Sequence, residues 1–216
     1  MPVDVILVGA GGFGREALDV VEAHNRAHPD DGITVLGVAD DDPSAVNLDR
    51  MRARGYRHLG TVADVMAASG CRRYVLGIGS PATKAALDRR FGSAGWRPVT
   101  VVHPAAVVGS RGELGEGVVI CAGAQVSTNV RLGRHVHLNP NATVGHDATL
   151  GDYVSLNPGG IVSGEVLVGS GTLVGAGAVI LQQLTIGSRT TIGAGSVVTK
   201  AVPDGVVVKG VPGVWE

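Results

Sequence analysis

The sequence predicts a chain in two parts, an α/β half-domain over residues 1–100 and an all-β parallel solenoid over residues 101–203, closed by a segment at 204–216. Three observations predict this. Apolar strand-like runs alternate with helical patterns in the first half, which is typical of a parallel sheet. An aliphatic residue recurs at every sixth position of the second half. Glycine is abundant, with 34 residues, while aromatic residues make up 3%, so the core is built from small side chains.

In the first half, strands are expected at residues 4–8, 33–39 and 73–79, since these runs are short and apolar, and glycine stops the first of them. Helices are expected at 14–24, 62–69 and 82–91, where apolar residues have helical spacing. The order of strands and helices predicts a Rossmann-like half-domain with one βαβαβ unit.

The second half repeats with a period of six that never slips. Seventeen consecutive positions six apart are all Val, Leu or Ile. They are Val102, Val108, Leu114, Ile120, Val126, Leu132, Leu138, Val144, Leu150, Leu156, Val162, Val168, Val174, Ile180, Ile186, Ile192 and Val198. Such self-similarity is the signature of a repeat architecture.

A period of six fits neither a helix nor a flat sheet, but it fits a short strand followed by a corner. Three sides close a coil of 18 residues, and coils stack at about the 4.8 Å spacing of paired strands. Glycine often follows the aliphatic residue by one place, as at Gly109 and Gly145, and we expect it to supply the backbone conformation of the corners.

Stacking places a polar cluster at one corner. Residues 18 apart lie above one another, so His146 lies between Thr128 and Gly164, and Asp147 lies between Asn129 and Glu165. A histidine has a pKa near neutrality, which suits a general base. His135 and His137 lie on neighbouring positions; lining of the cleft is one alternative for them, and the solvated surface is the expected one.

This pattern resembles the left-handed parallel β-helix of the hexapeptide-repeat acyltransferases, and the handedness is implied by the resemblance alone. With the N-terminal half-domain, the whole chain resembles the bacterial nucleotide-sugar N-acetyltransferases and sialic acid O-acetyltransferases, above all the bacillosamine-pathway type. The residues that carry the likeness are Asn139 and the pair His146-Asp147.

The resemblance implies an active site. His146 is the general base that deprotonates the attacking amine or hydroxyl, Asp147 orients or stabilises the imidazole, and the backbone N–H of Gly164 is the oxyanion donor. No covalent nucleophile is required, because the amine attacks the acetyl-CoA thioester directly. A direct contact between His146 and Asp147 requires corner geometry, since neighbours on a strand point to opposite faces.

The motif GAGGFG follows the first strand and opens the first helix, where a helix N-terminus favours negative charge. One half-domain has room for a mononucleotide, which favours a nucleotide sugar over NAD. Phe13 stands where sugar-acetylating members often have histidine. The predicted substrate-binding residues are Gly9, Gly11, Gly12, Phe13, Gly14, Asp40, Asp41, Gly79, Ser80 and Asn139.

The resemblance also places coenzyme A in a groove between neighbouring solenoids, toward the C-terminal coils. The predicted cofactor-binding residues are Gly164, Gly175, Gly193, Lys200, Lys209 and Pro212. It further implies a homotrimer with active sites between subunits.

Composition excludes several classes of function. A formal net charge of -1 argues against nucleic-acid binding, which needs a clustered basic surface. No signal peptide and no membrane span are recognisable, so a cytoplasmic protein is expected. Cys71 and Cys121 lack a CxxC spacing and are expected to be reduced. No metal site is expected, because no suitable histidine triple is evident.

The predicted function is acetyl-CoA-dependent N-acetylation of an amino sugar carried by a nucleotide, of the UDP-4-amino-sugar type. Two alternatives remain open. One is O-acetylation of a sugar such as sialic acid, and the other is a solenoid that binds nucleotide sugars or serves only as structure.

Overall fold

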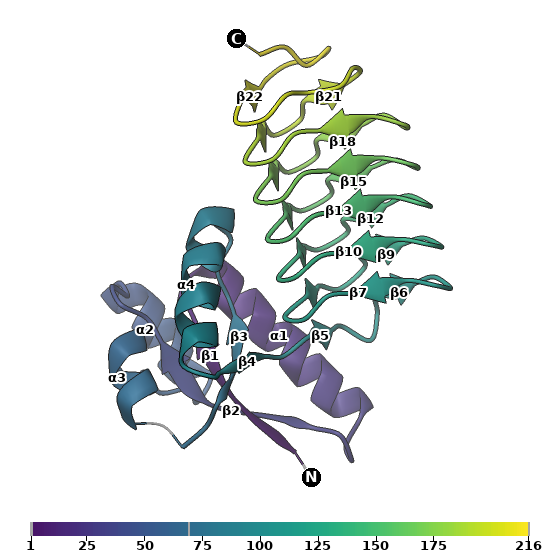
Figure 1. Cartoon of the computed structure of the whole chain (residues 1–216). Coiled ribbons are helices and arrows are strands. Elements are labelled where there is room, and N and C mark those ends of the chain that lie inside the picture. The colour runs from purple at the N-terminus through teal and green to yellow at the C-terminus, as the bar shows by residue number, and fades with distance from the viewer. Residues whose placement is uncertain (1, 69, 216) are drawn as a thin grey trace.

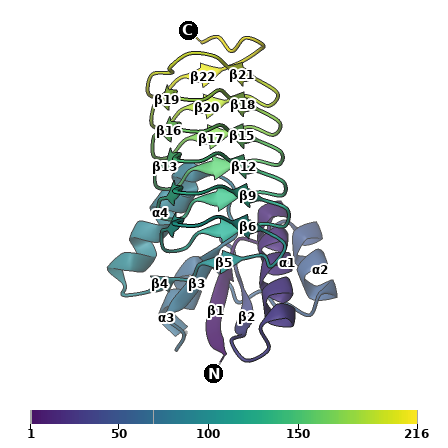
Figure 2. The same cartoon turned by 90° about the vertical axis from the view of Figure 1, so that its right-hand side faces the viewer.

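The computed structural model describes residues 2–68 and 70–215. The chain forms an N-terminal α/β domain and a parallel β-solenoid that rises beside it, with the C-terminus at the far end (Figure 1). Turning the molecule by 90° shows the strands of successive coils in register above one another (Figure 2).

The N-terminal domain has a parallel sheet of order β2-β1-β3-β4. Its strands are β1 (Val3–Val8), β2 (Ile33–Ala39), β3 (Arg73–Leu76) and β4 (Arg97–Pro98). Its helices are α1 (Gly12–Ala27), α2 (Ala45–Ala53), α3 (Val62–Ala68) and α4 (Pro81–Ser93). The predicted strands and helices are confirmed, although β3 ends at Leu76 rather than at residue 79. Position 69, at the end of the predicted helix 62–69, lies outside the described residues. Helix α2 and strand β4 were not predicted.

The solenoid consists of two-residue strands in three parallel sheets. Sheet I contains β5 (Val101–Val102), β8 (Val119–Ile120), β11 (His137–Leu138), β14 (Ser155–Leu156), β17 (Leu173–Val174), β20 (Thr191–Ile192) and β22 (Val207–Val208). Sheet II contains β6 (Val107–Val108), β9 (Gln125–Val126), β12 (Thr143–Val144), β15 (Ile161–Val162), β18 (Val179–Ile180) and β21 (Val197–Val198). Sheet III contains β7 (Glu113–Leu114), β10 (Arg131–Leu132), β13 (Thr149–Leu150), β16 (Leu167–Val168) and β19 (Thr185–Ile186).

The aliphatic repeat is the inner wall of the solenoid. Each strand from β5 to β21 ends on one of the seventeen predicted positions, and strand partners are 18 residues apart, as for Val144 and Val162. Most of these side chains are fully buried. Val108 and Leu114, in the first coil, stay 38% and 36% exposed because no coil lies below them.

The glycines that follow the aliphatic positions act differently from our expectation. They do not have positive φ; the positive-φ residues lie two places later, and include Asn141, Asp147 and Tyr153 as well as glycines. A Cβ on Gly145 would lie 2.5 Å from the backbone nitrogen of Gly164 in the next coil. These glycines are therefore required by the close stacking of coils rather than by the corner conformation.

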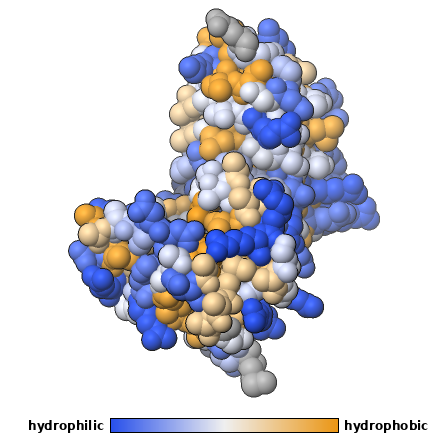
Figure 3. Space-filling view, turned by 60° about the vertical axis from the view of Figure 1, so that its left-hand side comes forward, coloured by the Kyte–Doolittle hydropathy of each residue, from blue (hydrophilic) through white to orange (hydrophobic). Residues whose placement is uncertain are grey.

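The N-terminal domain packs on sheet I. Helix α1 contacts β5 and β8, and the outward-facing Val101, Val119 and Cys121 join its core. On the face shown in Figure 3, hydrophobic surface gathers where the domain adjoins the solenoid. The prediction that His135 and His137 lie at the solvated surface is wrong: both are 0% exposed, because the domain covers this side of the prism.

Candidate active site

The predicted catalytic pair lies at the corner that joins sheet II to sheet III. The His146 Nδ1 atom lies 2.7 Å from Asp147 Oδ2. Asp147 has a φ of 60°, and this left-handed backbone turns two adjacent side chains toward the same side. The side chains are 57% and 46% exposed in the single chain, so the corner is accessible to substrate.

Asp147 is held from the coil below. The Asn129 Nδ2 atom donates a hydrogen bond of 2.9 Å to Asp147 Oδ1. This bond, together with the one to His146, lowers the pKa of Asp147 below its ordinary value. An ionised carboxylate can only accept, so the His146 Nδ1 atom carries the proton. In the neutral ring with this tautomer, the lone pair is on the Nε2 atom, the arrangement that a general base requires.

Gly164 lies directly against that nitrogen. A Cβ at position 164 would be 2.6 Å from His146 Nε2, so only glycine leaves room for the ring. Within the described part of the chain, the Gly164 N–H donates to no acceptor. An imidazole nitrogen and a residue with an unused backbone donor thus lie side by side at this corner. Glu165, which stacks on Asp147, instead accepts a 3.3 Å hydrogen bond from Gln183.

The Gly-rich loop lies at the carboxyl ends of β1 and β3, and its glycines are of two kinds. A Cβ on Gly9 would lie 2.7 Å from the Gly77 carbonyl oxygen, and Gly14 packs on the backbone of Gly9. These two allow α1 to approach the sheet. A Cβ on Gly11 or Gly12 would meet nothing within 4 Å, so a ligand can approach the start of α1 there.

Polar groups surround this loop. Asp40 Oδ2 accepts a 2.7 Å hydrogen bond from the Ala10 backbone N–H, and Asp41 Oδ1 accepts one of 2.7 Å from the Val62 N–H. Ser80 caps α4 by accepting from the Thr83 N–H, and Gly79 before it has open space at its Cβ. We call this set of loops, residues 9–14, 40–41 and 79–80, the nucleotide edge.

Within one chain, the nucleotide edge does not meet His146. The edge contacts sheet I, where Ser155 Oγ donates a 2.8 Å hydrogen bond to the Gly79 carbonyl and the Phe13 ring stacks on His137 with centroids 4.6 Å apart. His146 lies at the corner opposite sheet I. Asn139 lies at the I–II corner, 6% exposed, with its Nδ2 donating to the Leu156 carbonyl oxygen.

Apart from Gly164, the predicted cofactor residues lie in the last coils and the tail. The Nζ atom of Lys200 lies 4.8 Å from the centroid of the Trp215 ring, and Lys209 pairs with Val214 through the backbone. Lys209 and Trp215 line a groove of about 710 Å³. Pro212 lies in the turn between these segments, after a cis peptide bond. Trp215 was not predicted as a site residue, although aromatic residues make up only 3% of the chain and each is therefore a signal.

Gly175 and Gly193 have neighbours of their own. A Cβ on Gly175 would lie 2.5 Å from the Ala194 backbone nitrogen, and one on Gly193 would lie 2.9 Å from the Val208 carbonyl oxygen. Coil stacking thus accounts for both glycines without a ligand.

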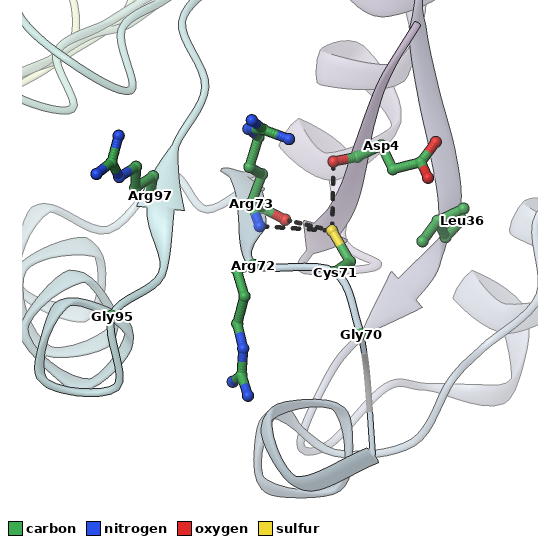
Figure 4. Close-up of a pocket in the computed structure, with 8 residues that line it drawn as sticks. All are labelled: Asp4, Leu36, Gly70, Cys71, Arg72, Arg73, Gly95 and Arg97. Carbon is green, nitrogen blue, oxygen red and sulfur yellow. Dashed lines mark hydrogen bonds between the residues drawn. The ribbon is translucent and has the colours of Figure 1, made fainter.

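Another cavity, of about 400 Å³, opens at the amino ends of β1 and β3, at the opposite end of the sheet from the nucleotide edge. Figure 4 shows Arg72, Arg73 and Arg97 around it. The Cys71 thiol donates a hydrogen bond to the Asp4 carbonyl oxygen. It contains none of the predicted site residues. Among the described residues, no helix is long and apolar enough to cross a membrane. In the same residues, no three His, Cys, Asp or Glu side chains are grouped as a metal site.

A solenoid of six-residue repeats with an exposed corner histidine defines the class of hexapeptide-repeat acyltransferases. The family model described as the PglD N-terminal domain matches residues 4–91, and the bacterial transferase hexapeptide model matches residues 165–200. No curated protein sequence matches the chain.

Solved structures match over the full length. PerB from Caulobacter crescentus, in complex with CoA and GDP-perosamine, is 30% identical with a TM-score of 0.87, over 99% of this chain and 97% of that one. The acetyltransferase domain of PglB from Neisseria gonorrhoeae, in complex with acetyl coenzyme A, is 27% identical with a TM-score of 0.85, over 100% of both chains. WeeI from Acinetobacter baumannii is 27% identical with a TM-score of 0.83, over 99% and 100%.

The chain therefore belongs to the PglD-type hexapeptide-repeat nucleotide-sugar N-acetyltransferases, a family of acetyl-CoA-dependent enzymes.

Proposed function

We propose that the protein transfers the acetyl group of acetyl-CoA to the amino group of a nucleotide-linked amino sugar, with His146 as the general base. The observation that carries this proposal is that His146 Nε2 lies against Gly164, whose N–H has no acceptor among the described residues, at one accessible corner. The Caulobacter relative has also been solved with CoA and GDP-perosamine after one histidine was replaced by Asn or Ala.

The reaction follows from these groups. The sugar amine attacks the thioester carbonyl, a C–N bond forms, and the carbonyl oxygen gains negative charge that the Gly164 N–H stabilises. His146 Nε2 takes the proton from the attacking nitrogen, and Asp147 stabilises the resulting imidazolium. Collapse of the tetrahedral intermediate breaks the C–S bond, and the proton passes from His146 to the leaving thiolate.

The nucleotide diphosphate is proposed to bind at the nucleotide edge. Gly11 and Gly12 leave the N-terminus of α1 accessible. Gly79 and Ser80 lie at the N-terminus of α4. Helix N-termini favour phosphate. Phe13 puts an aromatic ring rather than a hydrogen-bonding group beside this loop. We propose a UDP-linked 4-amino sugar as substrate, and the GDP-sugar bound by the Caulobacter relative makes GDP the second base to test.

Coenzyme A is proposed to reach the corner from the C-terminal coils. The groove at Lys209 and Trp215 offers a cation and an aromatic ring for the adenosine end. Lys200 lies over that ring and is proposed as a second cation for the phosphates. Pro212 shapes the turn that bounds this groove.

Because the nucleotide edge and the His146 corner lie on different sides of one chain, we propose that a site forms between two subunits of a homotrimer. Exposed aliphatic side chains flank the corner: Ile161, Leu167 and Leu181 are 38%, 51% and 38% exposed. A patch of this kind marks a surface for association.

Thiol release from acetyl-CoA with a panel of UDP-, GDP- and dTDP-linked amino sugars tests the proposal. Turnover with an amino sugar and none with the matched hydroxy sugar supports N-acetylation. Turnover only with hydroxyl acceptors would establish O-acetylation instead. Binding of a nucleotide sugar without turnover in any combination would leave only a binding protein.

A further inference from the structure

One buried carboxylate joins the two domains. Asp88, on α4, is 5% exposed. Its oxygens accept hydrogen bonds from the hydroxyls of Tyr74 and Tyr153, each 2.6 Å, and two of 2.8 Å from the Arg134 guanidinium. The His135 Nε2 atom lies 3.0 Å away. Tyr74 belongs to the N-terminal domain, whereas the other three partners belong to the solenoid.

This carboxylate is charged in the folded protein. Burial would raise the pKa of Asp88, but hydrogen bonds from Arg134, Tyr153 and Tyr74 outweigh burial and hold the pKa well below its usual range. A buried charge that is fully hydrogen-bonded fixes geometry, because any displacement leaves it or a donor without a partner.

A second ionisable side chain attaches the same helix. Lys84 lies one turn before Asp88 and is 0% exposed. Its Nζ atom donates hydrogen bonds of 2.8 Å to the His135 carbonyl and 3.2 Å to the Val154 carbonyl. Lys84 and Asp88 lie on one face of α4. Through them the helix contacts the corner between sheets III and I in two successive coils.

The helix that carries these contacts begins at the nucleotide edge. Ser80 caps α4, and the Gly79 carbonyl before it accepts the hydrogen bond from Ser155. Ser155 is two residues after Tyr153, a partner of Asp88. We call the contacts of Lys84 and Asp88 with the solenoid the junction. A rotation of α4 about this junction would therefore move the loop at residues 79–80 against the solenoid.

We propose that Asp88 is a positioning residue that fixes the nucleotide edge on the solenoid, so that a nucleotide-linked amino sugar reaches the acetyl-transfer corner of an adjoining subunit. This inference rests on the proposed function. A contact that only stabilises the fold would affect every acceptor equally. A positioning contact affects the acceptor bound through its nucleotide and leaves an unlinked amino sugar unaffected.

The test compares Asp88→Asn with Glu116→Gln. An asparagine presents an NH₂ group to the surrounding donors. Glu116 also pairs with Arg134, but it is 70% exposed and lies outside the junction, so it is the matched control. For Asp88→Asn we expect KM for the nucleotide sugar to rise about tenfold to hundredfold. KM for acetyl-CoA and the rate with a nucleotide-free amino sugar should stay at wild-type values, as should all constants of Glu116→Gln.

Equal losses with linked and unlinked acceptors, or an unchanged KM for the nucleotide sugar, would overturn the inference. If Asp88→Asn does not fold, Tyr153→Phe replaces it, because this variant removes only one hydrogen bond to the Asp88 carboxylate. We then expect a smaller rise of the KM for the nucleotide sugar.

Hydrogen–deuterium exchange separates a failure of this inference from a failure of the proposed function. Faster exchange at residues 9–14 and 77–80 in the junction variant, and not in Glu116→Gln, supports positioning even if the wild type turns over none of the sugars offered. Unchanged exchange at these loops would count against it.

Discussion

At the scale of single residues, three groups at one corner explain the chemistry proposed for the chain. Asp147 has a left-handed backbone and fixes the proton of His146 on Nδ1. The Nε2 atom then lies against Gly164, where the absence of a side chain leaves space for the ring. The proximity of His146 and Gly164 could be predicted from the sequence, because residues 18 positions apart lie above one another in a solenoid with 18-residue coils.

The first prediction is that His146→Ala lowers kcat about 10²- to 10⁴-fold, the usual contribution of a general base. The side chain is 57% exposed and contacts mainly Asp147, so the fold should be unaffected. Steady-state thiol release measures the rate. His28→Ala, an exposed histidine of the N-terminal domain, is the control. A near-wild-type rate for His146→Ala would remove the base assignment.

The second prediction concerns Gly164→Ala. Its φ lies outside the left-handed region, so alanine fits the backbone, but its Cβ would lie 2.6 Å from His146 Nε2. The imidazole must move, and we expect kcat to fall about a hundredfold with little change in unfolding temperature. Ser163→Ala, one residue earlier, should keep its rate. A fully active Gly164→Ala would show that the ring has no fixed place there.

At the scale of elements, the six-residue period predicted the strands of the solenoid, since the period fixes which side chains point inward. Short elements without a strong apolar pattern, α2 and β4, could not be predicted. The role of the glycines was misassigned, because the sequence shows where glycine recurs but not whether φ or the neighbouring coil excludes a side chain.

The third prediction separates these two roles by unfolding in urea. A Cβ on Gly151 would lie 2.8 Å from the Ser170 backbone nitrogen, so Gly151→Ala should lower the free energy of unfolding by about 1–3 kcal/mol. Gly159 has a φ of 64° and open space. Gly159→Asn should cost under about 1 kcal/mol, because Asn tolerates this conformation, as Asn141 does below it. Equal losses would contradict this division.

At the scale of the whole molecule, the placement of the N-terminal domain could not be predicted. The repeat shows that His135 and His137 are not part of the inner wall, but not which of three similar sheets another domain covers. Their burial beneath that domain lowers the pKa of His135 to about 4, with desolvation outweighing the attraction of Asp88, and lowers the pKa of His137 well below its usual value.

The fourth prediction follows from these shifts. Both imidazoles are neutral when folded and have a pKa of about 6.5 when unfolded. The unfolded chain therefore binds more protons below pH 6.5, and stability falls as the pH drops from there toward 4. Each histidine contributes at most about 1.4 kcal/mol per pH unit.

A substitution of His137 measures the contribution of one of these histidines to the pH dependence of stability. Among the described residues, neither of its ring nitrogens has a hydrogen-bond partner, so His137→Leu should be tolerated at pH 7.5. Urea unfolding at pH 7.5 and 5.5 should show a smaller loss of stability in this variant than in the wild type. An unchanged loss would contradict burial of a titrating imidazole at this position.

The central claim is that the nucleotide edge of one chain and the His146 corner of another form each site, and mixing two inactive variants tests it most directly. His146→Ala removes the base. Gly12→Glu puts a negative charge in open space at the start of α1, where it repels phosphate. After unfolding and refolding together in equal amounts, random mixing within the proposed trimers should regain about a quarter of the wild-type rate, since that share of sites combines two intact halves. Turnover that stays at the level of the separate variants, in assemblies shown to be mixed, would contradict the account.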